Sequence, residues 1–354
     1  MSLVIAATFF SFLAALLAIP LVCRIAAKYG FVDIPGGRKT HEVPVPPLGG
    51  FVIFTVFLIA SLVMGGVPWA LYAALGLILV TGIWDDSFEM NARLKFAIHF
   101  LAAIILVVFG GAQLQSLGDI LGTGELKLGI MSIPFSVACV VYILNALNMM
   151  DGLDGLAGGN ALIIFGWLML AALLGGNFAA ASQMLLLMAP LLGFLVYNMR
   201  TPWRSKAIIF LGDAGSMALG LMIAWYAMTL SQGAHAAISP ASVAWIIALP
   251  IVDAFGLLIT RLKEKRPPFV PDRRHVHHHF VDSGFPVRTA TPLILFWAFA
   301  LGAIGFVGEK IGLPEGVLGW LWVLLWWGHA IFITMKSENF KRLLQKVAPR
   351  RVDN

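Results

Sequence analysis

The sequence predicts an all-α, polytopic membrane protein that crosses the bilayer about eleven times. Apolar residues make up 60% of the 354-residue chain and charged residues only 12%, and the mean hydropathy is +0.89. A soluble domain carries about a quarter charged residues, so most of this surface is not built to face water. Apolar stretches of about 17 to 25 residues recur along the chain, and each is long enough to cross a hydrocarbon core of about 30 Å.

The individual spans follow from these stretches and from the connectors between them. The first stretch continues into Arg24 and Lys28 without a small-residue cleavage site, which indicates a retained anchor rather than a signal peptide. Glycine and proline mark the turns between later stretches, as at Gly65 and Gly175. The predicted helices are 3–27, 47–65, 68–84, 94–111, 131–150, 160–176, 182–200, 214–230, 241–262, 289–308 and 315–335.

The basic residues predict the orientation of these spans. With an outside N-terminus, 22 of the 24 Lys and Arg residues fall on the inner side, and only Lys127 and Lys310 fall outside. This asymmetry follows the positive-inside rule and places the C-terminus in the cytoplasm. Residues 336–354 form a basic tail that we interpret as a topology signal and a contact for anionic lipid of the bilayer. No nucleic-acid partner is expected.

The acidic residues gather on the same inner side, where 14 of the 18 Asp and Glu residues fall. Acidic residues contribute little to topology, so orientation does not explain this distribution. Ionisable groups at the edge of a span are costly and indicate a functional site. Cys23 and Cys139 both lie in apolar stretches, which predicts buried thiols and no disulfide or zinc framework.

Two motifs lie on the first inner loops. Residues 33–50 are rich in Pro and Gly and carry Lys39 and His41. This segment is either a flexible basic loop or a phosphate-contacting arm in which glycine lets the backbone approach the ligand. The second motif places Asp85 and Asp86 side by side at the inner end of a helix, where the helix dipole disfavours carboxylates. Neighbouring like charges repel, so a cation beside the pair is the favoured explanation.

The next two motifs combine Asp with Gly. In NALNMMDGLDGLAGG, residues 145–159, Asp151 and Asp154 are three residues apart, and Asn148 precedes them by about one turn. On a helical turn these side chains would share a face, and the glycines keep the backbone open to a ligand. In FLGDAGSMALG, residues 210–220, Asp213 opens a span. It is either an N-cap or a metal carboxylate at a helix N-terminus, where phosphate also binds well.

The last motif gathers histidine and arginine. Within residues 266–280 the chain carries Arg273, Arg274, His275, His277, His278 and His279. Clustered histidine suggests a metal, but Mg²⁺ prefers oxygen, so zinc would be required. Beside two arginines the cluster is more typical of donors to a pyrophosphate and a sugar, with a solvated loop as the alternative. Asp253, inside a predicted span, is either functional or paired internally.

Together these five segments resemble the polyprenyl-phosphate N-acetylhexosamine-1-phosphate transferases, the superfamily of WecA-type and MraY-type enzymes, over residues 33–280. The resemblance implies a single catalytic domain, 1–335, with its active-site loops at the cytoplasmic face of a bacterial inner (plasma) membrane. It implies that Asp213 and Asp85 hold Mg²⁺ (or Mn²⁺), and that Asp85, Asp86 and Asp213 are catalytic. It also implies that Asp154 lies near a uracil and that Phe210 stacks on that base. The substrate-binding residues it implies are Lys39, His41, Asn148, Asp151, Asp154, Phe210, Arg273, His275, His277 and His278.

The last loop favours one subfamily. DRRHVHH, residues 272–278, is similar to the D-R-x-H-x-H-H pattern of WecA-type enzymes. MraY-type enzymes carry a triple His followed by Phe-Glu, whereas Val281 stands here in place of the Glu. The resemblance therefore favours UDP-GlcNAc as donor and undecaprenyl phosphate as acceptor, giving lipid-pyrophosphate-GlcNAc and UMP for cell-envelope polysaccharide synthesis. A MraY-type or other UDP-N-acetylhexosamine donor is the alternative. The family often forms dimers, so the resemblance also implies a homodimer.

Two questions remain open at the level of sequence. The lipid phosphate either attacks the sugar-linked phosphorus directly or takes over the group from a covalent aspartyl intermediate. A polytopic transporter is the alternative from another functional class. A transporter would be expected to place charges or broken helices near mid-membrane and to show repeat symmetry, whereas the acids here lie at one face and no repeat is visible.

Overall fold

The computed structural model describes residues 2–34, 43–88, 90–234, 236–263, 265, 274–335 and 342. Over these residues the chain is helical, and its extended pairings are limited to three isolated bridges. The α-helices are α1 (Ser2–Tyr29), α2 (Gly49–Met64), α3 (Trp69–Phe88), α4 (Ala92–Phe109), α5 (Ser132–Met150), α6 (Leu156–Leu174), α7 (Phe178–Asn198), α8 (Gly212–Ser231), α9 (Pro240–Ile246), α10 (Ala248–Lys263), α11 (Val276–Asp282), α12 (Val287–Lys310) and α13 (Glu315–Thr334), and one 3₁₀ turn, η1 (Gly129–Met131), precedes α5.

The prediction of an all-α, multi-pass membrane protein is confirmed. Among the described residues, nine helices are long and apolar enough to cross a membrane. α2 is also apolar, but its 16 residues span about 24 Å, which is shorter than the hydrocarbon core. Each of the eleven predicted helices has a counterpart, whereas the short α11, between α10 and α12, was not predicted. Which side of the membrane each terminus occupies stays a prediction.

The ninth predicted span, 241–262, is not one helix. It is broken into α9 and α10, which meet at a bend of 75°. The break borders an apolar cavity of about 310 Å³ between α5, α8, α9, α10 and α13, lined by Phe135, Tyr142, Ile143, Ile247 and Trp322 among others. Hydropathy alone did not reveal the break because the apolar run continues through Ile246, Ile247 and Ala248 without a charge.

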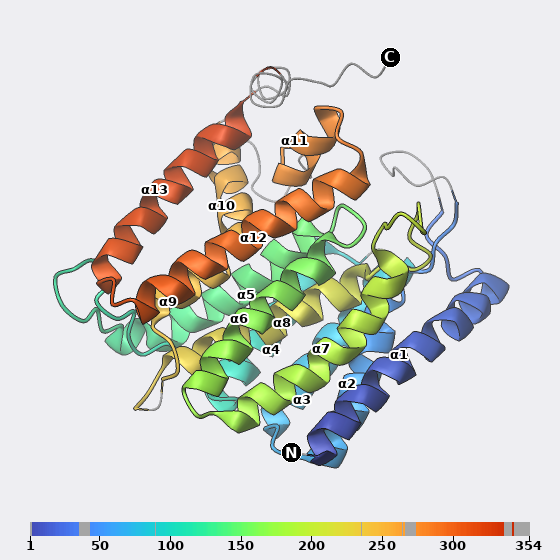
Figure 1. The fold of residues 1–354 in the computed structure, drawn as a ribbon, viewed down its shortest axis with the longest axis horizontal. Coiled ribbons are helices and arrows are strands. Elements are labelled where there is room, and N and C mark those ends of the chain that lie inside the picture. The colour runs from blue at the N-terminus through green and yellow to red at the C-terminus, as the bar shows by residue number, and fades with distance from the viewer. Residues whose placement is uncertain are drawn as a thin grey trace.

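Helix α8 forms the centre of the molecule, in contact with α2, α3, α5 and α6 (Figure 1). In the most apolar 18-residue stretch of α8, 94% of the residues are buried, whereas the corresponding fraction is 17% in α1 and 28% in α13. α1 and α13 lie at opposite edges of the bundle. Glycines allow the close approach. A Cβ at Gly82 of α3 would overlap the backbone of Ala214, and one at Gly50 of α2 would overlap that of Gly215. α2 and α3 therefore press directly against the first turn of α8.

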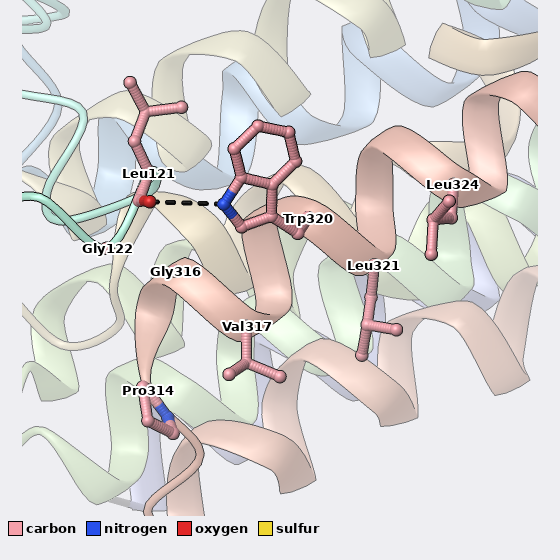
Figure 2. A pocket seen from close by; sticks show the side chains of 8 residues that line it. All are labelled: Leu121, Gly122, Pro314, Gly316, Val317, Trp320, Leu321 and Leu324. Carbon is pink, nitrogen blue, oxygen red and sulfur yellow. Dashed lines mark hydrogen bonds between the residues drawn. The ribbon is translucent and has the colours of Figure 1, made fainter.

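The start of α13 rests on the loop that connects α4 to α5. The Trp320 indole N–H donates to the carbonyl of Leu121 at 3.2 Å, and the Glu315 carboxylate accepts from the backbone N–H of Asp119 at 2.7 Å. Figure 2 shows the hollow beside this contact, which is lined by Leu, Gly, Pro, Val and Trp side chains and has no ionisable group. The opposite end of α13, at His329 and Ile333, meets α10 and α11. The hollow is therefore far from the acidic motifs.

Candidate active site

Two carboxylates from different helices meet on one ammonium group. The Lys95 Nζ, in the first turn of α4, lies 2.5 Å from Oδ2 of Asp85 in α3 and 2.5 Å from Oδ2 of Asp213 in α8. The other oxygen of Asp213 accepts from the Asn148 amide of α5 at 2.9 Å, and the same amide donates to Ser216 Oγ at 2.9 Å. Four helices thus place two acids, an amide and a cation at one point. Lys95 and Ser216 were not predicted.

Asp86 lies beside this centre but points elsewhere. Its Oδ1 accepts from the backbone N–H of Asp213 at 3.0 Å, and its Oδ2 lies 3.4 Å from that of Ala214. These are unpaired N–H groups of the first turn of α8, so Asp86 caps that helix from a neighbouring one. Gly212, at φ +75°, turns the chain into the helix, and a Cβ there would lie 2.7 Å from Asp86 Oδ2. Asp86 therefore holds the backbone that carries Asp213.

Asp151 and Asp154 do not share a helical face, because α5 ends at Met150 and α6 begins at Leu156. Asp154 Oδ2 accepts from Arg200 Nε at 2.6 Å, and the Asp154 carbonyl accepts from Thr291 Oγ1 at 3.1 Å. Arg200, which follows α7, was not predicted as a site residue. Burial raises the pKa of Asp151 to about 8, and the nearby charges of Asp213, Asp86 and Asp154 act in the same direction.

The α11 histidines close over this loop. The His277 ring lies against Gly152, where a Cβ would overlap its Nε2. His277 also lies near parallel to His275, with ring centroids 5.4 Å apart, and 4.2 Å from His278. Burial lowers the pKa of His277 to about 3, so the ring is neutral, and its Nδ1 finds no hydrogen-bond partner among the described residues. A buried polar atom left in this state is suited to a ligand.

The first-loop motif reaches the site through its backbone. Pro46 accepts from the Phe210 N–H at 2.9 Å, and the Phe210 and Leu211 carbonyls accept from Gly49 at 2.9 Å and Gly50 at 2.8 Å. This pairing fixes the segment that leads into Asp213, with Phe210 half-buried beside it. The predicted residues Lys39, His41 and Arg273 lie outside the described residues. The other predicted site residues are joined through the contacts above, and the role of each stays a prediction.

The chain is similar to known proteins over most of its length. Residues 68–231 match the family model described as glycosyl transferase family 4, a segment that contains Asp85, Asp151 and Asp213. The chain is similar to proteins named undecaprenyl-phosphate alpha-N-acetylglucosaminyl 1-phosphate transferase. It is 32% identical to the one from Yersinia pestis, covering 92% of both chains, and 32% identical to the one from Escherichia coli K12, covering 93% of this chain and 91% of the relative. It is 30% identical to the one from Salmonella typhimurium, covering 94% and 92%.

The resemblance inferred from the five motifs is thereby confirmed. The similarity spans nearly the full length of both chains, so it includes the α11 segment beyond the family model. The chain belongs to glycosyl transferase family 4 and is a membrane phosphotransferase of the polyprenyl-phosphate N-acetylhexosamine-1-phosphate transferase superfamily, WecA-type.

Proposed function

We propose that this enzyme transfers N-acetylglucosamine 1-phosphate from UDP-GlcNAc to undecaprenyl phosphate, in a reaction that requires Mg²⁺. The main support for this proposal is that Asp85 and Asp213 converge on one cation position. There the Lys95 Nζ lies 2.5 Å from a carboxylate oxygen of each acid. The names of the relatives, which specify undecaprenyl phosphate and an N-acetylglucosaminyl 1-phosphate group, support the two substrates. The products are the lipid-pyrophosphate-GlcNAc and UMP.

Asp85 and Asp213 fit a magnesium site. Both offer hard carboxylate oxygen, and Asn148 fixes the second oxygen of Asp213. Within the part of the chain that the structure describes, no three His, Cys, Asp or Glu side chains form a ready metal cluster. Mg²⁺ commonly takes one or two carboxylates and completes its shell with water and substrate phosphates, so the two acids suffice. When bound, the ion would offset the negative charge of the donor diphosphate.

The chemical step needs little base catalysis. An oxygen of the lipid phosphate forms a bond to the sugar-bearing phosphorus, and that phosphorus loses its bond to the oxygen that departs with UMP. The second pKa of a phosphate monoester is about 6, so the attacking group is already largely dianionic at neutral pH. The chain supplies charge and orientation instead. Lys95 offers its ammonium to phosphate oxygens, and the neutral His277 ring offers a hydrogen bond beside Gly152.

Direct attack is the mechanism we favour. Asp86, the member of the Asp85–Asp86 pair that does not contact Lys95, directs both carboxylate oxygens at backbone N–H groups of α8. A carboxylate held in this way is poorly placed as a nucleophile. A covalent intermediate would let labelled UMP exchange into UDP-GlcNAc in the absence of lipid phosphate, and direct attack predicts no such exchange. Observed exchange would therefore favour the covalent mechanism.

The donor is tested with purified enzyme, undecaprenyl phosphate and a panel of UDP-sugars. We expect UMP release with UDP-GlcNAc, and its loss when EDTA removes Mg²⁺. UDP-N-acetylgalactosamine and UDP-N-acetylmuramoyl-pentapeptide serve as comparison donors, since they share the uridine diphosphate of UDP-GlcNAc and differ in the group attached to it. UMP release with the muramoyl donor but not with UDP-GlcNAc would assign the chain a MraY-type specificity and overturn the proposed donor.

We place the reaction at the cytoplasmic face of a bacterial inner membrane, where the positive-inside distribution puts the acidic motifs. The broken span does not favour a transporter. The cavity at its break has no Asp, Glu, Lys, Arg or His in its lining. Asp85, Lys95 and Asp213 instead meet at the ends of α3, α4 and α8.

A further inference from the structure

A buried carboxylate lies behind the α11 histidines. Asp253, in α10, is 1% exposed and accepts three hydrogen bonds from two other elements. The His275 Nδ1 lies 2.8 Å from its Oδ2, and the backbone N–H of Val276 donates to Oδ1 at 2.9 Å. The His329 Nε2, from α13, lies 3.3 Å from Oδ1. Asp253 is thus the point at which α10, α11 and α13 are joined.

This arrangement fixes the chemistry of His275. Burying an ionised carboxylate among apolar helices is costly unless hydrogen-bond donors satisfy it. A carboxylate only accepts, so the His275 proton that faces Asp253 must be on Nδ1, and the His329 proton must be on Nε2. The Nε2 of His275 is therefore directed away from Asp253. A histidine whose one nitrogen is held by a carboxylate has a defined tautomer and ring orientation.

The orientation of the His275 ring is passed on to the loop between α5 and α6, which carries Asp151 and Asp154. The His275 and His277 rings are stacked, with an interplanar angle of 8°. The His277 ring in turn lies against Gly152, which stands between Asp151 and Asp154 in the sequence. A second attachment holds the same short helix, because His279 Nε2 lies 3.2 Å from the Ile333 carbonyl of α13. The chain of contacts runs from Asp253 through His275 and His277 to the Asp151–Asp154 loop.

We propose that Asp253 is a positioning residue for the sugar-nucleotide donor, assisted by His329. It acts through His275, whose tautomer and ring plane it fixes, and so seats the α11 histidines on the loop at Gly152. This proposal rests on the proposed function, in which the loop that carries Asp151 and Asp154 binds UDP-GlcNAc. It does not involve the lipid phosphate or the cation position at Asp85 and Asp213.

The decisive substitution is Asp253→Asn, which keeps the shape of the side chain but removes the charge and one acceptor. We expect kcat/KM for UDP-GlcNAc to fall roughly ten- to hundredfold, the range typical for partners that orient a ligating histidine. The KM for undecaprenyl phosphate and the Mg²⁺ dependence should stay within about twofold of wild type. Glu309→Gln is the matched control, since it removes a charge from the carboxylate that accepts from Ser239 N–H at 2.9 Å, at the opposite end of α12.

A mutant cycle separates positioning from general stability. If Asp253 acts through His275, then Asp253→Asn should add little to the loss already caused by His275→Ala. A purely structural role predicts additive losses, a lower melting temperature and equal effects on both substrates, and that pattern would overturn the proposal. So would an unchanged kcat/KM for UDP-GlcNAc in Asp253→Asn.

His329 provides a second test that does not depend on how well Asp253→Asn folds. His329→Gln keeps an N–H group that can donate to Asp253, so its KM for UDP-GlcNAc should stay close to that of the wild type. His329→Leu removes this N–H group and should raise the KM for UDP-GlcNAc. An equal KM for UDP-GlcNAc in the two His329 variants would contradict the proposal. If the wild-type enzyme proves to use another UDP-sugar, only the proposed donor is wrong, and the same comparisons with that sugar decide the positioning role.

Discussion

Lys95 joins side chains that are far apart in the sequence, since its two carboxylate partners belong to Asp85 and to Asp213, 118 residues away along the chain. Two carboxylates converging on one point repel each other unless a cation lies between them. The Lys95 ammonium supplies that charge in this structure. In the proposed function, Mg²⁺ and Lys95 share the negative charge of these two acids.

Lys95→Met should expose this sharing. We expect turnover to fall at least about tenfold, because hydrogen bonds to charged groups contribute about 1.5–3 kcal/mol. The melting temperature without metal should also fall, and Mg²⁺ should raise it more than it raises that of the wild type. Lys127→Met is the control, because Lys127 is 75% exposed beside Glu125 on the opposite loop. A Lys95→Met protein whose stability is insensitive to Mg²⁺ would argue against a shared cation position.

Asp213→Asn tests the carboxylate itself. A neutral amide is a poor Mg²⁺ ligand and does not neutralise Lys95, so we expect a folded protein with less than about a tenth of wild-type activity. Asp119→Asn is the matched control, since that acid accepts from Gly124 on the loop at the other end of the molecule. Activity of Asp213→Asn above this level at ordinary Mg²⁺ concentrations would remove Asp213 from the proposed ligands.

At the scale of the helices, the site depends on how closely α2 and α3 approach α8. The hydropathy pattern predicted these helices because each apolar run is long and is bounded by Gly or Pro. It did not predict the break between α9 and α10, which no charge or polar run marks. Nor did it predict the short α11, since a seven-residue helix has too few residues to show a periodic pattern.

A pair of glycines within α3 tests the role of close packing. Gly82→Ala should force α3 away from Ala214, because the new methyl group would overlap the α8 backbone. Overpacking of this kind costs about 1–3 kcal/mol, so the melting temperature should fall, and turnover should fall because Asp85 moves relative to Asp213. Gly76→Ala in the same helix meets nothing within 4 Å and should leave stability and turnover unchanged. Equal behaviour of the two variants would contradict this packing argument.

At the scale of the whole molecule, the segments of the site could be predicted better than their contacts. Asp85, Asn148 and Asp213 stood out because acids and amides at the ends of apolar helices have no role in topology, and the structure brings them together. Lys95 and Arg200 did not stand out, because a single basic residue at the end of a span predicted to face the cytoplasm is explained by topology alone. Their function depends on partners that only the fold supplies.

The orientation of the whole chain can be measured directly. A reporter fused after Asn354 and another inserted near Gly122 should lie on opposite sides of the membrane, with the C-terminus in the cytoplasm. The reason is that 22 of the 24 basic residues fall on one side of the predicted topology. Reporters on the same side would require a different number of spans and would separate some of the motifs from the cytoplasm.

The central claim is that a phosphate moves together with the sugar, and the fate of one phosphorus atom tests it most directly. The purified enzyme is given undecaprenyl phosphate, Mg²⁺ and UDP-GlcNAc labelled with ³²P in the phosphate next to the sugar. Transfer of the sugar phosphate predicts that the label enters the lipid fraction and that the released nucleotide is unlabelled UMP. Label recovered in UDP, with an unlabelled lipid product, would show transfer of the sugar alone and would contradict the reaction proposed for this site.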